Sequence, residues 1–449
     1  MKVDLVLKNC RLVSPRGITE AGVAVEDGKI AAIAREPYLP QADQVIDLKG
    51  RPVLPGVLDG HCHATSTPDT PETATRAAAR GGITTIHDMP GYEVPTFNPD
   101  DYRKKLQGFK GNCYIDYTLH GACASGHPAG SLQGMWGLGA TGIKFFVSDP
   151  GPGWPQTFDG EILDGFRELA SINGLALIHA ENDHIIKDSR RRLKAEGRRD
   201  FAAHLEERPR LAEVEAGRRI IQYLEETGCS GLIVHTSIPE TVLEAARARS
   251  RGVRVYVETC PQYLYLTDND VESRGPWVKF APPPRTKETV QEMRRLLASG
   301  MIDTVATDHA PFTREEKEVG IYDMLDAPNG IPGLEAFMPL LLNAVSEGWL
   351  TLTRLAEVVA ENPARLFGVY PRKGCLTTGS DADIVVLDLE KRHTIRDEDQ
   401  LTACGWTPYD GFKVKGAPIM ALIRGKTVME DGEVTAERGY GEHIARLNP

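Results

Sequence analysis

Short apolar runs alternate with longer helical stretches through the middle of the chain, and this alternation restricts the possible folds more than any other feature. Eight such runs occur, and in chain order they read GVLDGHCH, ITTIHDM, YIDYTLHG, GIKFFVS, LALIHAEN, LIVHTS, VRVYVETC and TVATDHAP. The segments between them, for example residues 213–228 and 289–300, are helical in character. Such alternation predicts parallel strands with crossover helices, and eight units predict a (β/α)8 TIM barrel of the α/β class. A doubly wound open sheet is the alternative, but no glycine-rich dinucleotide fingerprint opens the first unit.

The two ends of the chain differ from the middle because both are rich in short β-type segments. Turn signals separate these segments, such as Asp27-Gly28 near the start and Asp431-Gly432 near the end. We expect the two ends to pair into one small β-sandwich domain. The predicted division is therefore 1–55 for the N-terminal part of the sandwich, 56–372 for the barrel and 373–449 for the C-terminal part of the sandwich.

The bulk composition excludes several classes of protein. The chain has 449 residues, more than one ordinary domain holds, and its formal net charge of −11 predicts neither a nucleic-acid partner nor an anionic membrane surface. No stretch approaches the roughly 20 consecutive apolar residues of a membrane span, and the first residues lack the apolar core of a signal peptide. Eight cysteines are scattered without a CxxC pair, which indicates reduced thiols and a cytoplasmic protein.

Five of the eight runs end in a side chain that can bind a metal ion. These side chains are His61 and His63 in the first run, Lys144 in the fourth, His179 in the fifth, His235 in the sixth and Asp308 in the eighth. Residues two apart on a strand share a face, so the first two histidines point the same way. Barrel enzymes build their active sites at the C-terminal ends of several strands at once. Alone, the two histidines would be interpreted as satisfied side chains of a polar loop and Lys144 as a salt-bridging residue, but together these residues predict a metal site.

The chain resembles the amidohydrolase superfamily, and within it the cyclic-amide hydrolases: hydantoinases, dihydropyrimidinases, allantoinases and dihydroorotases. The order HxH, Lys, His, His, Asp on successive barrel strands carries the resemblance. Further segments support it, namely PGVLDGHCH, GGITTIHDMP, VETCPQYL, APPPRTKE, TDHAPFTREEK, APNGIPGLE, ENPARLFG and GSDADIVVLD. They span nearly the whole chain, including both β-rich ends.

The resemblance implies two divalent metal ions, most often zinc, with manganese or another metal as the alternative. One ion would be held by His61, His63 and Asp308, and the other by His179 and His235. Lys144 would bridge both ions as N6-carboxylysine, a carbamate formed with CO₂. This modification makes chemical sense because a free ammonium has three donors and no acceptor to offer a cation, whereas a carbamate has two anionic oxygens.

The resemblance also implies the reaction, which is the opening of a cyclic amide or ureide by a hydroxide that bridges two metal ions. Asp308 would take the proton and pass it to the leaving amide nitrogen. Asn329 in APNGIPG and the backbone at Ala281 match positions at which hydantoinases contact the ring. The alternative for Asn329 is a turn residue before Gly330. We also expect a homo-oligomer, a dimer or a tetramer, that acts on a small molecule.

The identity of the ring is less well defined by the sequence. Dihydroorotases follow HxH with Leu-Arg to grip a carboxylate, whereas this chain has Ala64-Thr65, which favours a neutral ring. Hydantoinases usually carry a tyrosine shortly after the bridging lysine, and KFFVSDPGPGW has none. Allantoin therefore stays open as a substrate, and dihydroorotate remains an alternative. His309 would point to the opposite side of its strand from Asp308 and is interpreted as a residue that supports the site.

Two other classes of function compete with this hypothesis. Some hydantoinase-like proteins are assembly scaffolds that have lost metal ligands, but all six ligand positions are present here. Mononuclear deaminases also use HxH with later His and Asp residues, but they do not need a lysine on the fourth strand. Lys144 and the APNGIPG segment argue against a deaminase.

Overall fold

The parallel strands form a closed barrel in the computed structural model, which describes residues 2–91, 93–126, 130–151 and 154–447. In chain order the barrel strands are β6 (Leu58–Cys62), β7 (Thr85–Asp88), β8 (Asp116–Leu119), β9 (Gly121–Ala122), β10 (Ile143–Phe146), β11 (Leu175–His179), β12 (Ser230–Ile233), β13 (Val255–Thr259) and β14 (Thr304–Val305). Neighbouring strands pair in chain order, and every pair is parallel. His120 alone separates β8 from β9, so these two act as one barrel strand.

The barrel closes between its first and last strands. A parallel bridge joins Cys62 at the end of β6 to His309, which lies just beyond β14. The backbone N–H of His63 donates to the carbonyl of His309 at 2.8 Å beside this bridge. Within the described part of the chain the barrel therefore has eight strand positions, and the predicted (β/α)8 barrel is confirmed.

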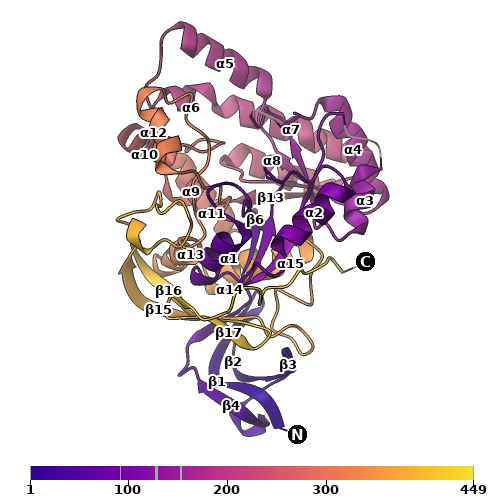
Figure 1. The fold of residues 1–449 in the computed structure, drawn as a ribbon, viewed down its shortest axis with the longest axis vertical. Coiled ribbons are helices and arrows are strands. Elements are labelled where there is room, and N and C mark those ends of the chain that lie inside the picture. Colours follow the sequence, from indigo (N-terminus) through magenta and orange to yellow (C-terminus); the bar gives the residue numbers. More distant parts are fainter. Residues whose placement is uncertain (1, 92, 127–129, 152–153, 448–449) are drawn as a thin grey trace.

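Helices follow the barrel strands and surround them (Figure 1). They are α1 (Pro71–Arg80), α2 (Pro99–Phe109), α3 (Ser131–Gly137), α4 (Asp159–Ser171), α5 (Asp183–Ala195), α6 (Ala203–Glu207), α7 (Arg210–Thr227), α8 (Pro239–Ser250), α9 (Gln262–Tyr265), α10 (Asp268–Arg274), α11 (Lys287–Ala298), α12 (Arg314–Tyr322), α13 (Phe337–Ser346), α14 (Leu352–Ala356) and α15 (Asn362–Leu366). The two stretches predicted as helices, 213–228 and 289–300, lie largely within α7 and α11. Local sequence sets their ends: α1 begins after the capping residue Thr70, and α7 ends at Gly228 with φ +67°.

Both chain ends contribute to one β domain below the barrel (Figure 1). Its strands are β1 (Lys2–Ser14), β2 (Gly17–Glu26), β3 (Lys29–Ala34), β4 (Gln41–Asp47), β5 (Pro52–Pro55), β15 (Ile384–Thr394), β16 (Lys413–Ile423), β17 (Lys426–Glu430) and β18 (Glu433–Val434). They pair in the order β18-β17-β16-β15-β5-β1-β2-β3, with β4 on β1, so β5 and β15 join the two ends. The predicted association of the termini is confirmed, while the exact domain boundaries stay a prediction.

Turn chemistry fixes the hairpins of this domain. Asp27 and Gly28 have φ angles of +50° and +74° between β2 and β3, and Asp431 and Gly432 have +48° and +89° between β17 and β18. Two successive residues with positive φ are typical of the tight turn that matches the twist of a hairpin. The Asp-Gly pairs noted in the sequence therefore act as predicted.

One continuous core links the β domain to the barrel. Val13, Leu54 and Val385 from the β domain belong to the same buried cluster as Ile86 of β7 and Phe337 of α13. This packing holds the β domain against the barrel, and β5 leads directly into the N-terminal end of β6. No helix of the described residues is both long and apolar enough to cross a membrane.

Candidate metal centre

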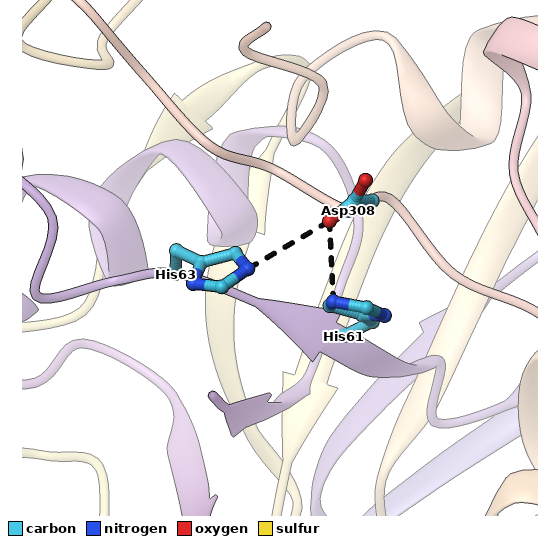
Figure 2. A group of neighbouring side chains, drawn as sticks. All are labelled: His61, His63 and Asp308. Atoms are coloured by element: carbon cyan, nitrogen blue, oxygen red, sulfur yellow. Dashed lines mark ion pairs between the residues drawn. The ribbon is translucent and has the colours of Figure 1, made fainter. Parts of the chain in front are cut away.

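Two histidines and an aspartate meet at the C-terminal end of the barrel, as Figure 2 shows. His61 lies near the end of β6 and His63 directly follows the strand, and alternation of side chains sends both rings to one side. Oδ1 of Asp308 lies 3.1 Å from Nε2 of His61 and 3.7 Å from Nε2 of His63. One ligand atom from each side chain can therefore reach a common metal ion.

The hydrogen bond at Nδ1 of His61 determines whether Nε2 presents a hydrogen or a lone pair to Asp308. Nδ1 of His61 lies 2.8 Å from Oε1 of Glu258, and an imidazole that donates from Nδ1 keeps a lone pair on Nε2. Burial, and then the Lys144 ammonium, hold the pKa of His61 well below its usual value, so the ring is neutral. The Nε2 lone pair thus faces a carboxylate oxygen, which is also an acceptor. A cation between the two acceptors satisfies both, so the side chains present fit a divalent metal ion.

A second pair of imidazoles lies beside the first group. Nδ1 of His179, the last residue of β11, is 3.0 Å from Nε2 of His235, which follows β12. Nε2 of His179 is 2.8 Å from Glu181, so the lone pair of this ring points toward His235. The ring centroids of His61 and His235 are only 5.3 Å apart. The two groups of ligand atoms are therefore neighbours, as a site for two ions requires.

Lys144 comes from β10 and is almost completely buried. Its Nζ lies 5.0 Å above the ring centre of Phe146. Burial lowers the pKa of Lys144 to about 8, although the carboxylates of Asp308 and Glu258 oppose the shift. After burial in each case, the charge of this lysine also lowers the pKa of His61, His63, His179 and His235. Lys144 therefore interacts electrostatically with both histidine groups.

Two of these residues have a backbone that side chains other than glycine rarely adopt. The φ angles are +39° at His235 and +49° at Asp308. Nearby hydrogen bonds hold both bends: the N–H of His235 donates to Glu258 at 3.2 Å, and the residue after Asp308 accepts from His63. Local strain that surrounding contacts overcome is typical of functional sites.

Buried carboxylates lie behind the imidazoles, and the sequence pattern alone assigns no role to them. Glu258 accepts from His61 and from the backbone of His235, and Glu181 accepts from His179. Burial alone would raise the pKa of Glu181, but Arg208 and His179 hold it down to about 2. Carboxylates in this position fix the tautomer and orientation of metal-binding histidines. The available signal was an acidic residue at the end of an apolar run, as in VRVYVETC and LALIHAEN.

The two predicted substrate contacts lie on neighbouring segments. Asn329 is exposed in the connection between α12 and α13, and Ala281 is half-buried after β13. Two fully buried lysines hold these segments together through main-chain carbonyls. Nζ of Lys317 donates to the carbonyls of Lys279, Pro328 and Gly330 at 2.9, 3.1 and 2.9 Å. The roles of Asn329 and Ala281 stay predictions.

Three further histidines at strand ends make other contacts. His309 is fully buried and points to Asp69 on the other side of its strand, as the alternation predicts. His87 and His120 stack inside the barrel with ring centres 5.8 Å apart. All eight cysteines are free thiols and buried.

A model of the amidohydrolase family matches residues 53–428. The chain belongs to the amidohydrolase family. It is 38% identical to the L-hydantoinase of Paenarthrobacter aurescens over 99% of this chain and 98% of that protein. It is 35% identical to an allantoinase of Rubrobacter xylanophilus over 96% of each chain. The solved structure of an L-hydantoinase (dihydropyrimidinase) from Arthrobacter aurescens superimposes with a TM-score of 0.96 at 38% identity, covering 99% of this chain and 100% of that one. These amidohydrolase relatives confirm the resemblance to the cyclic-amide branch.

Proposed function

We propose that this protein is a metal-dependent hydrolase that opens neutral cyclic amides or ureides of the hydantoin and dihydropyrimidine type. The observation that carries the proposal is the pair of facing acceptors, Nε2 of His61 and Oδ1 of Asp308, at 3.1 Å beside the His179–His235 pair. This arrangement occurs in a chain that is similar over its whole length to proteins named hydantoinase and allantoinase.

The six residues predicted from the sequence supply the ligands in this proposal. His61, His63 and Asp308 hold one divalent ion, and His179 and His235 hold the other. When bound, the ions supply Lewis acidity, which polarises a carbonyl and makes water a nucleophile near neutral pH. Zinc is the expected metal, and manganese is the alternative.

Lys144 completes the site as a carbamate in this proposal. Its amine attacks CO₂ to form a C–N bond, loses a proton to solvent and becomes N6-carboxylysine with two anionic oxygens. The buried surroundings favour the neutral amine that this step requires. A carbamate also places two anionic oxygens among the other five ligands, where an ammonium would repel bound metal ions.

Asp308 is the proposed proton carrier. Its side chain is 13% exposed, so it stands at the open side of the site, whereas His61 is fully buried behind it. Asp308 accepts the proton of the attacking water and delivers it to the ring nitrogen as the C–N bond breaks. The ring thereby opens to a carbamoyl acid or its equivalent, and no protein nucleophile is needed.

The charges around the site favour a neutral ring over dihydroorotate. Ala64 and Thr65 stand where an arginine would grip a substrate carboxylate. Two nearby arginines are buried, but Arg208 pairs with Glu181, and Arg285 pairs with Glu213 at 3.0 Å. Since both guanidiniums are already neutralised, neither offers a free positive charge to an anionic ring.

A screen of ring substrates tests the function. Protein loaded with zinc or manganese is assayed by ultraviolet absorbance with hydantoins, dihydropyrimidines, allantoin and dihydroorotate. We expect the highest kcat/KM with a neutral ring. Allantoin is the second candidate, because no tyrosine follows Lys144 in KFFVSDPGPGW and an allantoinase is among the relatives. A kcat/KM for dihydroorotate above that of every neutral ring would contradict the proposed specificity.

We also propose the cell compartment and the oligomeric state of the enzyme. We expect a cytoplasmic homo-oligomer, a dimer or tetramer, and light scattering of purified protein measures its mass. A metal content below one ion per chain with no carbamate would favour a scaffold that lacks catalysis.

A further inference from the structure

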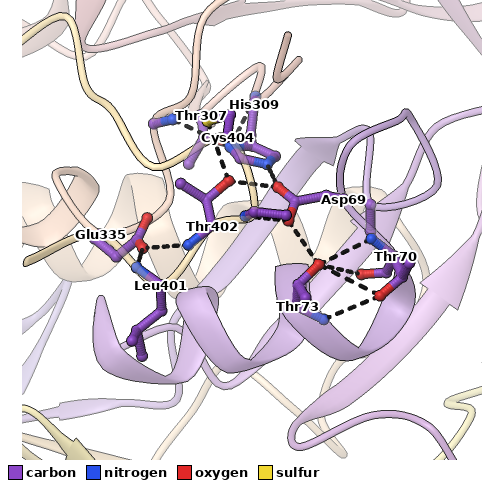
Figure 3. Close-up of polar contacts among 12 residues, drawn as sticks. Asp69, Thr70, Thr73, Thr307, His309, Glu335, Leu401, Thr402 and Cys404 are labelled. Atoms are coloured by element: carbon purple, nitrogen blue, oxygen red, sulfur yellow. Dashed lines mark hydrogen bonds and ion pairs between the residues drawn. The ribbon is translucent and has the colours of Figure 1, made fainter. Parts of the chain in front are cut away.

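A single buried carboxylate receives four hydrogen bonds behind the metal centre (Figure 3). Oδ1 of Asp69 accepts from the hydroxyl of Thr73 at 2.6 Å and from the N–H of Ala403 at 2.8 Å. Oδ2 accepts from Nε2 of His309 at 2.9 Å and from the hydroxyl of Thr402. Burial alone would raise the pKa of Asp69, but these bonds leave it below its usual value. Asp69 is therefore an ionised acceptor with no room for a donor.

His309 is fixed at every polar atom. Its Nδ1 accepts from the N–H of Gly333 at 3.2 Å, so the ring hydrogen is on Nε2 and points to Asp69. Its backbone N–H donates to the hydroxyl of Thr307 at 2.9 Å, and its carbonyl accepts from His63 at 2.8 Å. The residue therefore connects the first metal-facing strand to the last one.

Asp308 sits between two residues that carboxylates anchor. On one side, Asp59 accepts from the N–H of Thr307 at 2.9 Å and from its hydroxyl at 2.6 Å. On the other side, Asp69 holds His309. The φ angle of +49° at Asp308 is unfavourable by itself, so the two anchors determine where its carboxylate points.

Half of the donors to Asp69 come from the β domain. Thr402 and Ala403 lie in the connection between β15 and β16, which reaches up to the barrel rim. Glu335 accepts from the N–H groups of Leu401 and Thr402 at 2.6 and 3.0 Å and holds this connection in place (Figure 3). The carboxylate of Asp69, which orients His309, therefore also accepts hydrogen bonds from a segment far along the chain.

We infer that Asp69 is a positioning residue for Asp308 that acts through His309, and that the connection between β15 and β16 has to be seated for the metal centre to take its active geometry. This inference deepens the proposed function and rests on it for the role of Asp308. A purely structural role of the same hydrogen bonds would lower stability without a specific effect on the metal ligands.

Two pairs of variants separate these roles. Asp69→Asn keeps the size but turns an amide NH₂ toward two donors. His309→Asn becomes too short to reach Asp69, whereas His309→Gln places its amide nitrogen where Nε2 was. We expect about 10–100-fold lower kcat with little change in KM for the first two variants, as for other residues that orient metal ligands. His309→Gln should retain most of the activity.

A second readout does not depend on the substrate. The visible spectrum of cobalt(II)-loaded protein reports the geometry of the ligands, and Asp69→Asn and His309→Asn should change it while His309→Gln does not. Failure of wild-type protein to open any ring would contradict the proposed function, but the cobalt spectra would still report on Asp69.

The matched control is Asp303→Asn, at the opposite end of β14. Asp303 is half-buried and accepts from the N–H of Val257 and from Arg249, each at 2.8 Å. We expect it to lose stability but to keep kcat and the cobalt spectrum. If Asp69→Asn prevents folding, Thr402→Val removes one donor and should give a smaller change of the same kind. Wild-type kcat and spectrum in a folded Asp69→Asn or Thr402→Val variant would overturn the inference, as would equal losses in Asp303→Asn.

Discussion

Removal of Glu258 should weaken both metal binding and the fold. Its Oε1 is the acceptor for Nδ1–H of His61 at 2.8 Å and for the backbone N–H of His235 at 3.2 Å. Glu258→Ala leaves both donors buried without a partner, which costs about 1–3 kcal/mol for each donor. Without this acceptor, the His61 ring is no longer held in the tautomer that keeps its lone pair on Nε2. We expect about 10–100-fold weaker metal binding, the range known for such carboxylates.

Glu258→Gln separates geometry from charge. Its amide oxygen still accepts from both donors, so only the charge is lost. A hydrogen bond to a charged group is worth about 1 kcal/mol more than a neutral one, which predicts roughly fivefold weaker binding. Competition with a chromophoric chelator measures the metal affinity of both variants.

The control for Glu258 is Asp383→Asn, near the N-terminal end of barrel strand β8. Asp383 is also buried, and it accepts from Lys373 at 2.6 Å and from the N–H of Arg424 at 2.9 Å. This variant should lose stability and keep its metal affinity. Metal binding by Glu258→Ala within threefold of wild type would refute the reasoning, because two buried donors would then have lost their acceptor without consequence.

Three further predictions concern other parts of the molecule. Lys144→Ala should lose metal and nearly all activity while keeping its fold, and acetate should restore part of the activity. Lys144→Arg should fail as well, because a guanidinium forms no such carbamate. Wild-type activity of Lys144→Arg with two bound ions would disprove the bridging role of Lys144. Lys317→Met leaves three carbonyls without their donor and should raise KM for the ring more than it lowers kcat, because the Asn329 segment loosens; an unchanged KM would exclude this segment from substrate binding. Burial opposes ionisation of Asp381, but Lys373, Lys29 and Arg372 hold its pKa at about 2, below the ordinary 3.8. A carboxyl group whose pKa is lower in the folded state stabilises the fold at pH values above the pKa of the unfolded state. This stabilisation is lost as the pH falls through the pKa of the folded state. Urea unfolding should therefore show a loss of stability from about pH 4 to pH 2, and this loss should be smaller in Asp381→Asn.

The barrel and the β domain were predictable because their signals are repeated. Eight apolar runs with intervening helices constrain the middle of the chain, and a slip in one run does not alter the conclusion. The Asp27-Gly28 and Asp431-Gly432 turns require positive φ, which few other pairs accept at low cost. The relative order of the strands in the β domain was beyond the sequence, because pairing of β5 with β15 depends on contacts between residues more than 300 positions apart.

The grouping of His61, His63 and Asp308 was predictable, but the partners of their side chains were not. His61, His63 and Asp308 end strands, and strand ends meet at one side of a barrel. Glu258 and Glu181 also end apolar runs, yet nothing in the sequence tells which imidazole each of them meets. That information depends on the rotation of each side chain about its strand, which is set by packing in three dimensions. The sequence is equally uninformative about what Asn329 contacts, because this exposed residue lies in a long connection and not in a repeated pattern.

The seam between β6 and β14 explains why barrel closure and chemistry depend on the same residues here. Asp59 joins the two strands through Thr307, and His63 joins them through the carbonyl of His309. Asp308 lies within this seam, so the hydrogen bonds that close the barrel also determine the distance between the two sides of the first metal group. A substitution in the seam should therefore change ligand geometry and stability together, whereas a substitution at the N-terminal end of β14 should change stability alone. The separation of these two effects is a property of the closed barrel, because an open sheet has no contact between its first and last strands.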